Sequence, residues 1–490
     1  MSELTVQVGV IVLYLGVLAG IGAYTYRRTG RDPVSYFLAE RGLGTLVLTF
    51  TLLATLLSAF TFLGVPADAY THGLGIFLGV GVTDAFISVL FFYFGYRLWQ
   101  AAHRFGFVTP SEFFGHRFNS PLLALLYSLS ALLFTAPYIS IQIIGGGRLI
   151  ETLSDGAIPY LPAAIVMASV ILVYVLFGGM QAVAWTDTLQ GILMLVGILI
   201  AFVLTALTIT SRGGLGAIAP AGTDLSAWFA LPGPTGRWTW QGLVGYQLLI
   251  FMAVPLFPQV FQRFYTAKSP AVFKKMMVVW PLLVLLLFFP AVLIGVWGRA
   301  FFPDLANADQ IMPLMLGEVL PGAVAAIVIT ATIAALMSTA DSQLLTTSSL
   351  FTRDVYARYV NPDITPAREG VVGRISVAVI AIVSFVIAVN PPGVIAEIAT
   401  WSFQGSAMLF PTLVAGLYWR RCTRAGAVAG TLVSMGLTVG FLSGLLPGAW
   451  ALGWIPVIPS VLVGTVVIVV VSLLTEVDEE RLEPYLDLWR

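Results

Sequence analysis

The 490-residue sequence is too apolar for a soluble protein, because 58% of its residues are hydrophobic and only 10% are charged, against about 25% charged residues in soluble domains. Its mean hydropathy of +0.94 indicates a polytopic membrane protein. Lys plus Arg and Asp plus Glu each number 24, so no strongly basic surface points to nucleic acid, and the single cysteine, Cys422, excludes an internal disulfide.

Windows of about 20 apolar residues predict thirteen membrane spans and therefore an all-α fold in a lipid bilayer. In chain order the predicted spans are 5–26, 44–70, 75–101, 121–150, 158–178, 184–210, 239–265, 276–301, 320–349, 371–390, 393–419, 425–446 and 452–474. The first run lacks the basic start and cleavage site of a signal peptide, so we expect a retained helix. No soluble domain or nucleotide-binding loop is recognisable, which argues against an ATP-driven pump.

Basic residues are divided unevenly between the two sides that these spans define. If the first loop is cytoplasmic, all but four of the 24 basic residues lie in cytoplasmic segments. The exceptions are Arg148, Arg212, Arg237 and Arg299. The positive-inside rule then predicts a multi-pass protein of the cell membrane with its N-terminus outside and its C-terminus in the cytoplasm.

Two of the predicted spans contain helix-breaking residues. The second span carries Gly64 and Pro66, and the seventh carries Pro255 and Pro258. Interrupted helices five spans apart are typical of transporters built from two inverted five-helix repeats, with a binding site near the middle of the membrane. The alternative is that the prolines only kink the helices for packing.

The stretch 327–352, IVITATIAALMSTADSQLLTTSSLFT, begins as an apolar helix and becomes a run of hydroxyl groups. Helical spacing places Ala335, Ser338 and Thr339 on one side of one turn. One carbonyl and two hydroxyl oxygens there could form half of a cage for a small hard cation. Alternatively, the hydroxyl groups bond carbonyls of their own helix or pack against other spans.

Ionisable residues within the predicted spans are few, and we single out four that are acidic. They are Asp84, Asp187, Asp341 and Glu397. A charge at the centre of a membrane helix costs about 2.5–3.5 kcal/mol on insertion scales, so we expect each to face the bundle or a cavity. For Asp84 we favour a buried hydrogen-bonding role, and for Glu397 a solvated position near the outer end of span eleven. Asp187 could also be a solvated acid in the first turn of span six.

Five stretches resemble the sodium:solute symporter family. They are SYFLAERGLG (35–44), TPSEFFGHRF (109–118), FGGMQAVAWTDTLQG (177–191), PQVFQRFYTAKS (258–269) and AALMSTADSQLLTTSSLFTRDVY (334–356). The last is the most specific, and the stretches follow one another in the order found in that family.

The resemblance implies a LeuT-like core of two inverted five-helix repeats, at 44–210 and 239–419. A peripheral helix and loop (1–43) would precede this core, and two peripheral helices (425–474) and a cytoplasmic tail (475–490) would follow it. The resemblance also implies a sodium site between the second and ninth spans. Its oxygen atoms would come from the backbone of Ala54, Leu57 and Ala335 and from the hydroxyl groups of Ser338 and Thr339.

Asp187 matches an aspartate that the family associates with sodium coupling. Some relatives hold a second sodium ion between that aspartate and the hydroxyl-rich helix, and here the ion would recruit Ser338, Asp341 and Ser342. This chain has Asp341 where those relatives have a hydroxyl group. It also has Leu56 where some relatives have a polar residue, which weakens the case for a sugar or proline as substrate.

The stretch PYISIQIIGGGRLIETLSDGAIPY (137–160) is similar to the pantothenate and monocarboxylate branches of the family. A small organic anion would also suit the positive ends of broken helices. The candidate solute-binding residues are Ser58, Thr61, Tyr138, Gln142, Trp401 and Gln404. Packing is the alternative role for the two aromatic residues, whereas an unpaired amide inside a bundle is costly.

We therefore predict a sodium-coupled symporter that imports a small organic solute, a carboxylate of the pantothenate or monocarboxylate type, by alternating access, with Na⁺ as the coupling ion and no enzymatic activity. His72, His103 and His116 are scattered near span ends, which argues against an intramembrane enzyme. The remaining alternatives are a sensor or channel-like protein of the same fold, proton coupling through Asp341 or Asp187, and an amino acid or other small solute. The oligomeric state is not predicted.

Overall fold

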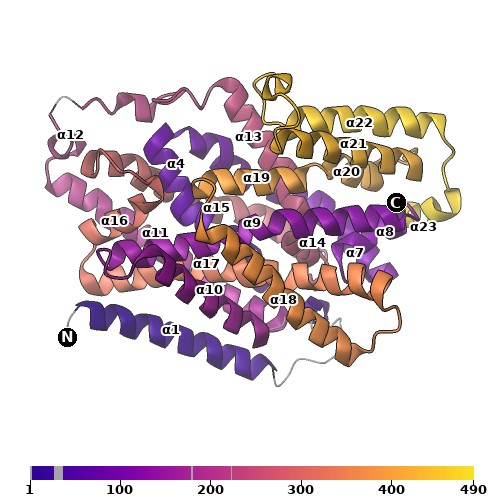
Figure 1. The fold of residues 1–490 in the computed structure, drawn as a ribbon, viewed down its shortest axis with the longest axis horizontal. Coiled ribbons are helices and arrows are strands. Elements are labelled where there is room, and N and C mark those ends of the chain that lie inside the picture. Colours follow the sequence, from indigo (N-terminus) through magenta and orange to yellow (C-terminus); the bar gives the residue numbers. More distant parts are fainter. Residues whose placement is uncertain (1–2, 27–36, 178–179, 222, 490) are drawn as a thin grey trace.

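The computed structural model describes all residues except 1–2, 27–36, 178–179, 222 and 490. These exceptions include Ser35 and Tyr36 of the first family-like stretch and Gly178 and Gly179 of the third. Within the described residues the fold is helical, with no β-strand and one isolated parallel β-bridge, between Leu43 and Ala267. Long helices run side by side through the molecule (Figure 1).

In the described part of the first half of the chain, four unbroken helices have 18 to 33 residues and the others are shorter. In chain order the helices are α1 (Glu3–Tyr26), α3 (Thr45–Leu56), α4 (Val65–His72), α5 (Val82–Phe86), α6 (Ser88–Leu90), α7 (Tyr96–Phe105), α8 (Pro110–Arg117), α9 (Pro121–Leu153), α10 (Tyr160–Phe177) and α11 (Met180–Ser211). The π-helical turns Phe60–Gly64, Phe77–Gly81 and Phe91–Gly95 connect the short pieces. As a result, Phe77–Phe105 forms one apolar helix that is long enough to cross a membrane.

The second half repeats this mixture of intact and interrupted helices. They are α12 (Leu215–Ile218), α13 (Trp240–Ala253), α14 (Pro258–Phe264), α15 (Ala271–Phe301), α16 (Ile311–Val319), α17 (Gly322–Leu350), α18 (Pro366–Val389), α19 (Ile395–Ala407), α20 (Phe410–Tyr418), α21 (Arg424–Leu442), α22 (Val457–Leu474) and α23 (Glu479–Trp489). A π-helical segment, Phe351–Val360, extends α17.

By length and composition, eight helices in the described part of the chain can cross a membrane, or ten if each of two bent pairs counts as one span. Each of the predicted ranges coincides with a helix or with consecutive helices, while the total of thirteen spans stays a prediction. The bent pairs are Thr45–Leu56 with Phe60–His72, at 58°, and Trp240–Leu256 with Pro258–Phe264, at 56°. The second and seventh predicted spans are therefore interrupted.

The two interruptions differ in how well the sequence marked them. The second bend falls at Phe257, between Pro255 and Pro258, as expected for residues that cannot continue a helix. The first falls at Leu57 and Ser58, whereas Gly64 and Pro66 lie in continuous helix, so their predicted role as the break is wrong. Glycine at position 64 allows close packing of this segment against α19, because a Cβ there would lie only 2.9 Å from Ile395 Cγ2.

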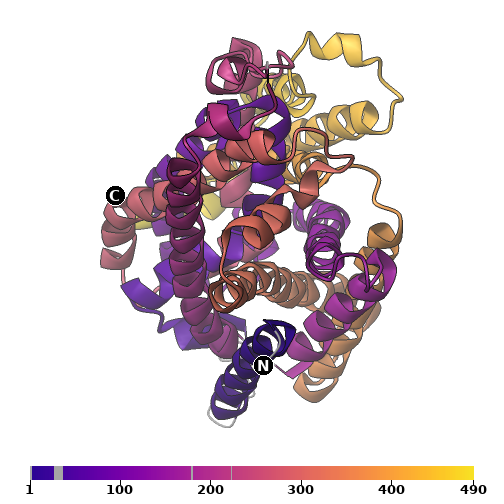
Figure 2. The same cartoon turned by 90° about the vertical axis from the view of Figure 1, so that its left-hand side faces the viewer.

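Helix α17 is the central helix of the bundle. In its most apolar 18-residue window 83% of the residues are buried, against 28% for α11 and for the helix Arg368–Val389. It contacts α1, α3, α9, α11, α14 and α18. Helix α1 and the α21–α22 pair lie on opposite sides of the bundle (Figures 1 and 2). The hydroxyl-rich part of α17 is therefore surrounded by other helices.

The segments next to the two broken helices are joined to each other at one end of the molecule. Leu43, just before α3, donates its N–H to the Thr266 carbonyl at 3.0 Å and accepts from the Lys268 N–H at 2.9 Å. Thr266 and Lys268 follow α14. Since α3 and α14 are each one half of an interrupted span, the β-bridge holds these two halves together.

Candidate functional site

The first interruption leaves backbone groups that cannot follow the helical pattern. Leu57 is extended, with φ −84° and ψ 100°. The Oγ of Ser58 accepts the Phe60 N–H at 3.1 Å, and its carbonyl accepts the N–H groups of Thr61 and Phe62. Ser58 thus starts the next helical segment, and the carbonyls at the end of α3 are left for other partners.

Helix α17 supplies those partners through its hydroxyl groups. Ser338 Oγ lies 2.8 Å from the Ala54 carbonyl oxygen and 3.1 Å from that of Ala335. Thr339 Oγ1 lies 3.1 Å from the Thr55 carbonyl oxygen and 3.3 Å from that of Ala54. All five residues are buried. The structure therefore brings together four of the five predicted sodium ligands, with the fifth, Leu57, at the break itself.

The chemistry of this first group suits a small monovalent cation. Its oxygen atoms are neutral carbonyl and hydroxyl oxygens, which hard cations accept in place of water. Contacts of 2.8–3.3 Å between them show that they share one small space. Sequence reasoning missed Thr55, because a backbone carbonyl that becomes available only at a tertiary break leaves no local signal.

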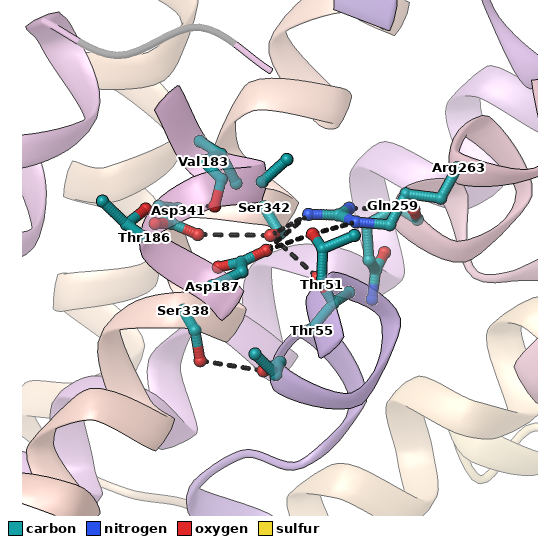
Figure 3. Close-up of polar contacts among 12 residues, drawn as sticks. Thr51, Thr55, Val183, Thr186, Asp187, Gln259, Arg263, Ser338, Asp341 and Ser342 are labelled. Atoms are coloured by element: carbon teal, nitrogen blue, oxygen red, sulfur yellow. Dashed lines mark hydrogen bonds and ion pairs between the residues drawn. The ribbon is translucent and has the colours of Figure 1, made fainter. Parts of the chain in front are cut away.

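A second polar group lies on the same face of α17, around the Arg263 guanidinium (Figure 3). Its Nη2 is 3.0 Å from Asp187 Oδ2 and donates to Ser342 Oγ at 2.6 Å. Its Nε donates to Thr51 Oγ1 at 3.0 Å, and Thr51 in turn donates to Asp187 Oδ2. Ser342 Oγ is also 3.2 Å from Asp341 Oδ1. One side chain of α14 therefore joins α3, α11 and α17.

The charges of this second group do not balance. Two carboxylates, Asp187 and Asp341, surround one guanidinium, and all three side chains are at most 1% exposed. Asp187 Oδ1 and Asp341 Oδ2 are buried without a hydrogen-bond partner in the described part of the chain. An uncompensated buried charge is costly, so the group suits one further positive charge.

The two polar groups touch through Thr55. Its carbonyl oxygen accepts from Thr339 in the first group, and its Oγ1 donates to Ser342 Oγ in the second at 2.9 Å. A displacement of Thr55 would therefore alter hydrogen bonds in both groups.

The structure adds one residue to this second group and corrects one expectation about it. The charge count places Arg263 among the basic residues of the cytoplasmic side, and the structure shows that it lies inside α14 with no exposed surface. The alternative that Asp187 is a solvated acid is wrong, since its carboxylate is fully buried against that guanidinium. The signal that could have located Arg263 is its position in a predicted span, five residues after Pro258.

The candidate solute-binding residues divide into two sets. Ser58 Oγ and Tyr138 Oη are 3.0 Å apart, and Gln142 Oε1 accepts the Ala59 N–H at 2.9 Å. Thr61, two residues further along the same segment, is 2% exposed. The structure thus gathers Ser58, Tyr138 and Gln142 beside the first interruption.

Trp401 and Gln404 do not join that set. Trp401 is 39% exposed at the surface of the bundle, and Gln404 Oε1 accepts the Val457 N–H at the start of α22. The other two ionisable residues, Asp84 and Glu397, belong to neither of the two polar groups. The expected hydrogen-bonding role of the Asp84 side chain is not found, because its buried Oδ1 has no hydrogen-bond partner among the described residues; only its backbone carbonyl accepts, from Trp280 Nε1. Glu397 is exposed in the first turn of α19, as expected.

Four aromatic rings, which sequence reasoning did not group, complete this part of the molecule. Phe60 follows the first interruption and Phe257 forms the second, while Tyr138 comes from α9 and Phe403 from α19. We call these four residues the aromatic cluster. Their rings contact one another between the two interruptions.

This chain, with two polar groups at a helix break inside an apolar bundle, is similar in sequence to known proteins. The sequence profile of the Sodium:solute symporter family matches residues 36–434. The chain belongs to this family. The sodium/pantothenate symporter of Escherichia coli (strain K12) is 31% identical over 460 residues, which cover 92% of this chain and 93% of that protein.

Other sodium:solute symporters are similar along nearly the whole chain. The sodium/pantothenate symporter of Haemophilus influenzae is 29% identical, covering 87% of this chain and 88% of that protein. The sodium/proline symporter of Staphylococcus aureus (strain NCTC 8325 / PS 47) is also 29% identical, covering 95% and 92%.

Solved structures show the same fold. A Na⁺-coupled sialic acid symporter in a substrate-bound outward-open state has a TM-score of 0.79 at 21% identity, over 96% of this chain and 98% of that one. Mhp1, a nucleobase-cation-symport-1 family transporter, has a TM-score of 0.59 at 13% identity, over 91% and 97%. The predicted all-α, LeuT-like fold of this family member is confirmed.

Proposed function

We propose that this sodium-coupled symporter imports a small organic carboxylate across the cell membrane. Family membership makes the chain a symporter of sodium and a small solute. The carboxylate is supported by the similarity to sodium/pantothenate symporters and by the positive end of the helical segment that begins at Phe60. The orientation, N-terminus outside, is supported by the excess of basic residues in the predicted cytoplasmic segments.

We assign the first sodium site to the carbonyl oxygens of Ala54, Leu57 and Ala335 and the hydroxyl groups of Ser338 and Thr339. The observation that carries this proposal is the convergence of α17 hydroxyl groups on the carbonyls at the end of α3. A sodium ion there would join an interrupted helix to an intact one. Binding would therefore favour the arrangement in which the two helices are together, which is how an ion biases alternating access.

We expect uptake of a carboxylate to depend on a sodium gradient. A tenfold inward gradient stores about 1.4 kcal/mol per ion, enough to accumulate a solute about tenfold for each ion coupled. Proteoliposomes would be given labelled organic acids, amino acids and sugars, with sodium and pH gradients imposed separately at a fixed membrane potential. Uptake of an acid that follows the pH gradient alone would contradict sodium coupling, and uptake restricted to sugars or amino acids would contradict the carboxylate.

We assign a second sodium site to Asp187, Asp341 and Ser342, next to Ser338. The charge imbalance around Arg263 supports it, because one monovalent cation would neutralise the group. We expect about two sodium ions per solute. The ratio follows from the membrane potential at which net solute flux stops under fixed gradients. If the unmodified protein and Asp341→Ser both transport one sodium ion per solute, Asp341 does not take part in ion coupling.

A further inference from the structure

The aromatic cluster lies where a solute between the two interruptions would bind. Ring centroids are 5.4 Å apart for Phe60 and Phe403, 5.3 Å for Phe257 and Phe403, and 5.4 Å for Tyr138 and Phe403. Tyr138 and Phe257 are 5.9 Å apart. Each residue is at most 5% exposed. Two rings belong to the broken helices and two to intact ones, so any relative movement of these helices changes the cluster.

A solute that binds within the aromatic cluster must replace the ring–ring contacts that it disrupts. Edge-to-face and tilted aromatic pairs contribute about 0.5–1.5 kcal/mol each beyond the apolar area that they bury. A solute that enters between Phe60 and Phe403 separates rings that now touch. It recovers that free energy only if it presents its own apolar surface to both of them.

The polar groups beside the cluster are nearly all occupied. Ser58 Oγ contacts both Tyr138 Oη and the Phe60 N–H. Gln142 accepts the Ala59 N–H and donates its Nε2 to the Tyr138 carbonyl at 3.1 Å. A polyhydroxylated solute would therefore lack partners, and each unpaired buried hydroxyl group costs roughly 1–3 kcal/mol.

An unpaired hydroxyl group and the positive end of a helix are available to bind one polar head group of a solute. Segments 52–64 and 244–261, which contain the interruptions, have no Asp, Glu, Lys, Arg or His. Thr61 Oγ1 is buried without a hydrogen-bond partner in the described part of the chain. Thr61 lies in the first turn of the 13-residue helical segment Phe60–His72, whose positive end favours an anion. A carboxylate there would meet a hydroxyl donor and a helix dipole, and neither interrupted segment supplies an acidic side chain.

We propose that the solute is a monocarboxylate with one compact apolar body, alkyl or aryl, which packs among Phe60, Tyr138, Phe257 and Phe403. This inference rests on the proposed transport of a carboxylate and narrows it. Polyhydroxylated acids, including pantothenate with its two hydroxyl groups and amide, are then poor solutes for this chain.

Sodium-dependent uptake into proteoliposomes tests the proposal, with protein-free liposomes as the control for passive diffusion of weak acids. The probes are phenylacetate, 3-methylbutanoate, pantothenate, gluconate, L-proline and D-glucose at equal concentration. We expect the two apolar acids to be taken up at least tenfold faster than pantothenate or gluconate. If pantothenate or gluconate is as fast, the inference fails and carboxylate transport stands. If only proline or glucose is taken up, carboxylate transport itself fails.

A ring-deletion pair separates contact with the solute from general packing. Phe403→Leu is expected to raise the half-saturating concentration of phenylacetate at least tenfold and that of acetate less than twofold. Phe289→Leu removes a ring outside the cluster, 45% exposed and packed on Phe77, and is expected to change neither. Phe60→Leu, on a different helix, should repeat the selective loss and replaces Phe403→Leu if that variant does not fold. An equal shift for both acids would overturn the proposal.

Discussion

Replacing Arg263 by glutamine is expected to lower the initial rate of sodium-driven uptake by roughly a hundredfold or more, equivalent to about 2.7 kcal/mol. The guanidinium is the only cation found among the described partners of Asp187 and Asp341, and both carboxylates are buried. Its removal leaves two like charges facing each other in an apolar bundle. The free energy of unfolding should fall by about 3–5 kcal/mol, the usual cost of breaking a buried ion pair.

The exposed pair Arg212 and Glu318 provides the control. Their charged atoms are 2.9 Å apart, against 3.0 Å for Arg263 and Asp187, but the side chains are 46% and 38% exposed. Arg212→Gln should therefore change stability by less than about 1 kcal/mol and leave uptake intact. Thermal denaturation in detergent and initial uptake rates measure both effects. Wild-type uptake by Arg263→Gln would show that this ion pair is dispensable for transport.

Ser338→Ala and Thr339→Ala are each expected to raise the sodium concentration for half-maximal uptake about tenfold, or about 1.4 kcal/mol. Each change removes one hydroxyl oxygen beside the Ala54 carbonyl. The double variant should lose less than the sum of the two effects, because both hydroxyl groups share that carbonyl.

Thr330→Ala is the matched control on the same helix. Its hydroxyl group is buried like the other two but bonds the Ala326 carbonyl of its own helix at 2.7 Å. Its sodium dependence should match that of the unmodified protein. Unchanged sodium dependence in both Ser338→Ala and Thr339→Ala would place the ion elsewhere.

The sequence predicted features that depend on local composition. Apolar windows located the helices, and Pro255 and Pro258 located the second interruption because proline lacks the N–H that a helix needs. The first interruption has no such residue. It is held locally by Ser58 Oγ, and by two tertiary partners, the amide of Gln142 and the hydroxyl groups of α17. A search for Gly and Pro therefore placed it too late in the chain.

Charged residues were harder to place than helices. Arg263 pairs with a carboxylate 76 positions away, and composition alone made it one more basic residue near a span end. Trp401 was predicted as a solute-binding candidate on span eleven, with packing as its alternative role. Helix α19 mixes apolar and polar residues around its circumference, so its sequence does not decide which way that ring points.

The attachment of the last two long helices determines how movement in this protein is best measured. Gln404 of α19 accepts a hydrogen bond from the first residue of α22, and Thr412 of α20 is 2.6 Å from Thr431 of α21. These contacts join α19 to α22 and α20 to α21, so the four helices form one block. Spectroscopic probes placed on this block and on α3 or α14 would therefore report how far the broken helices move relative to one defined unit.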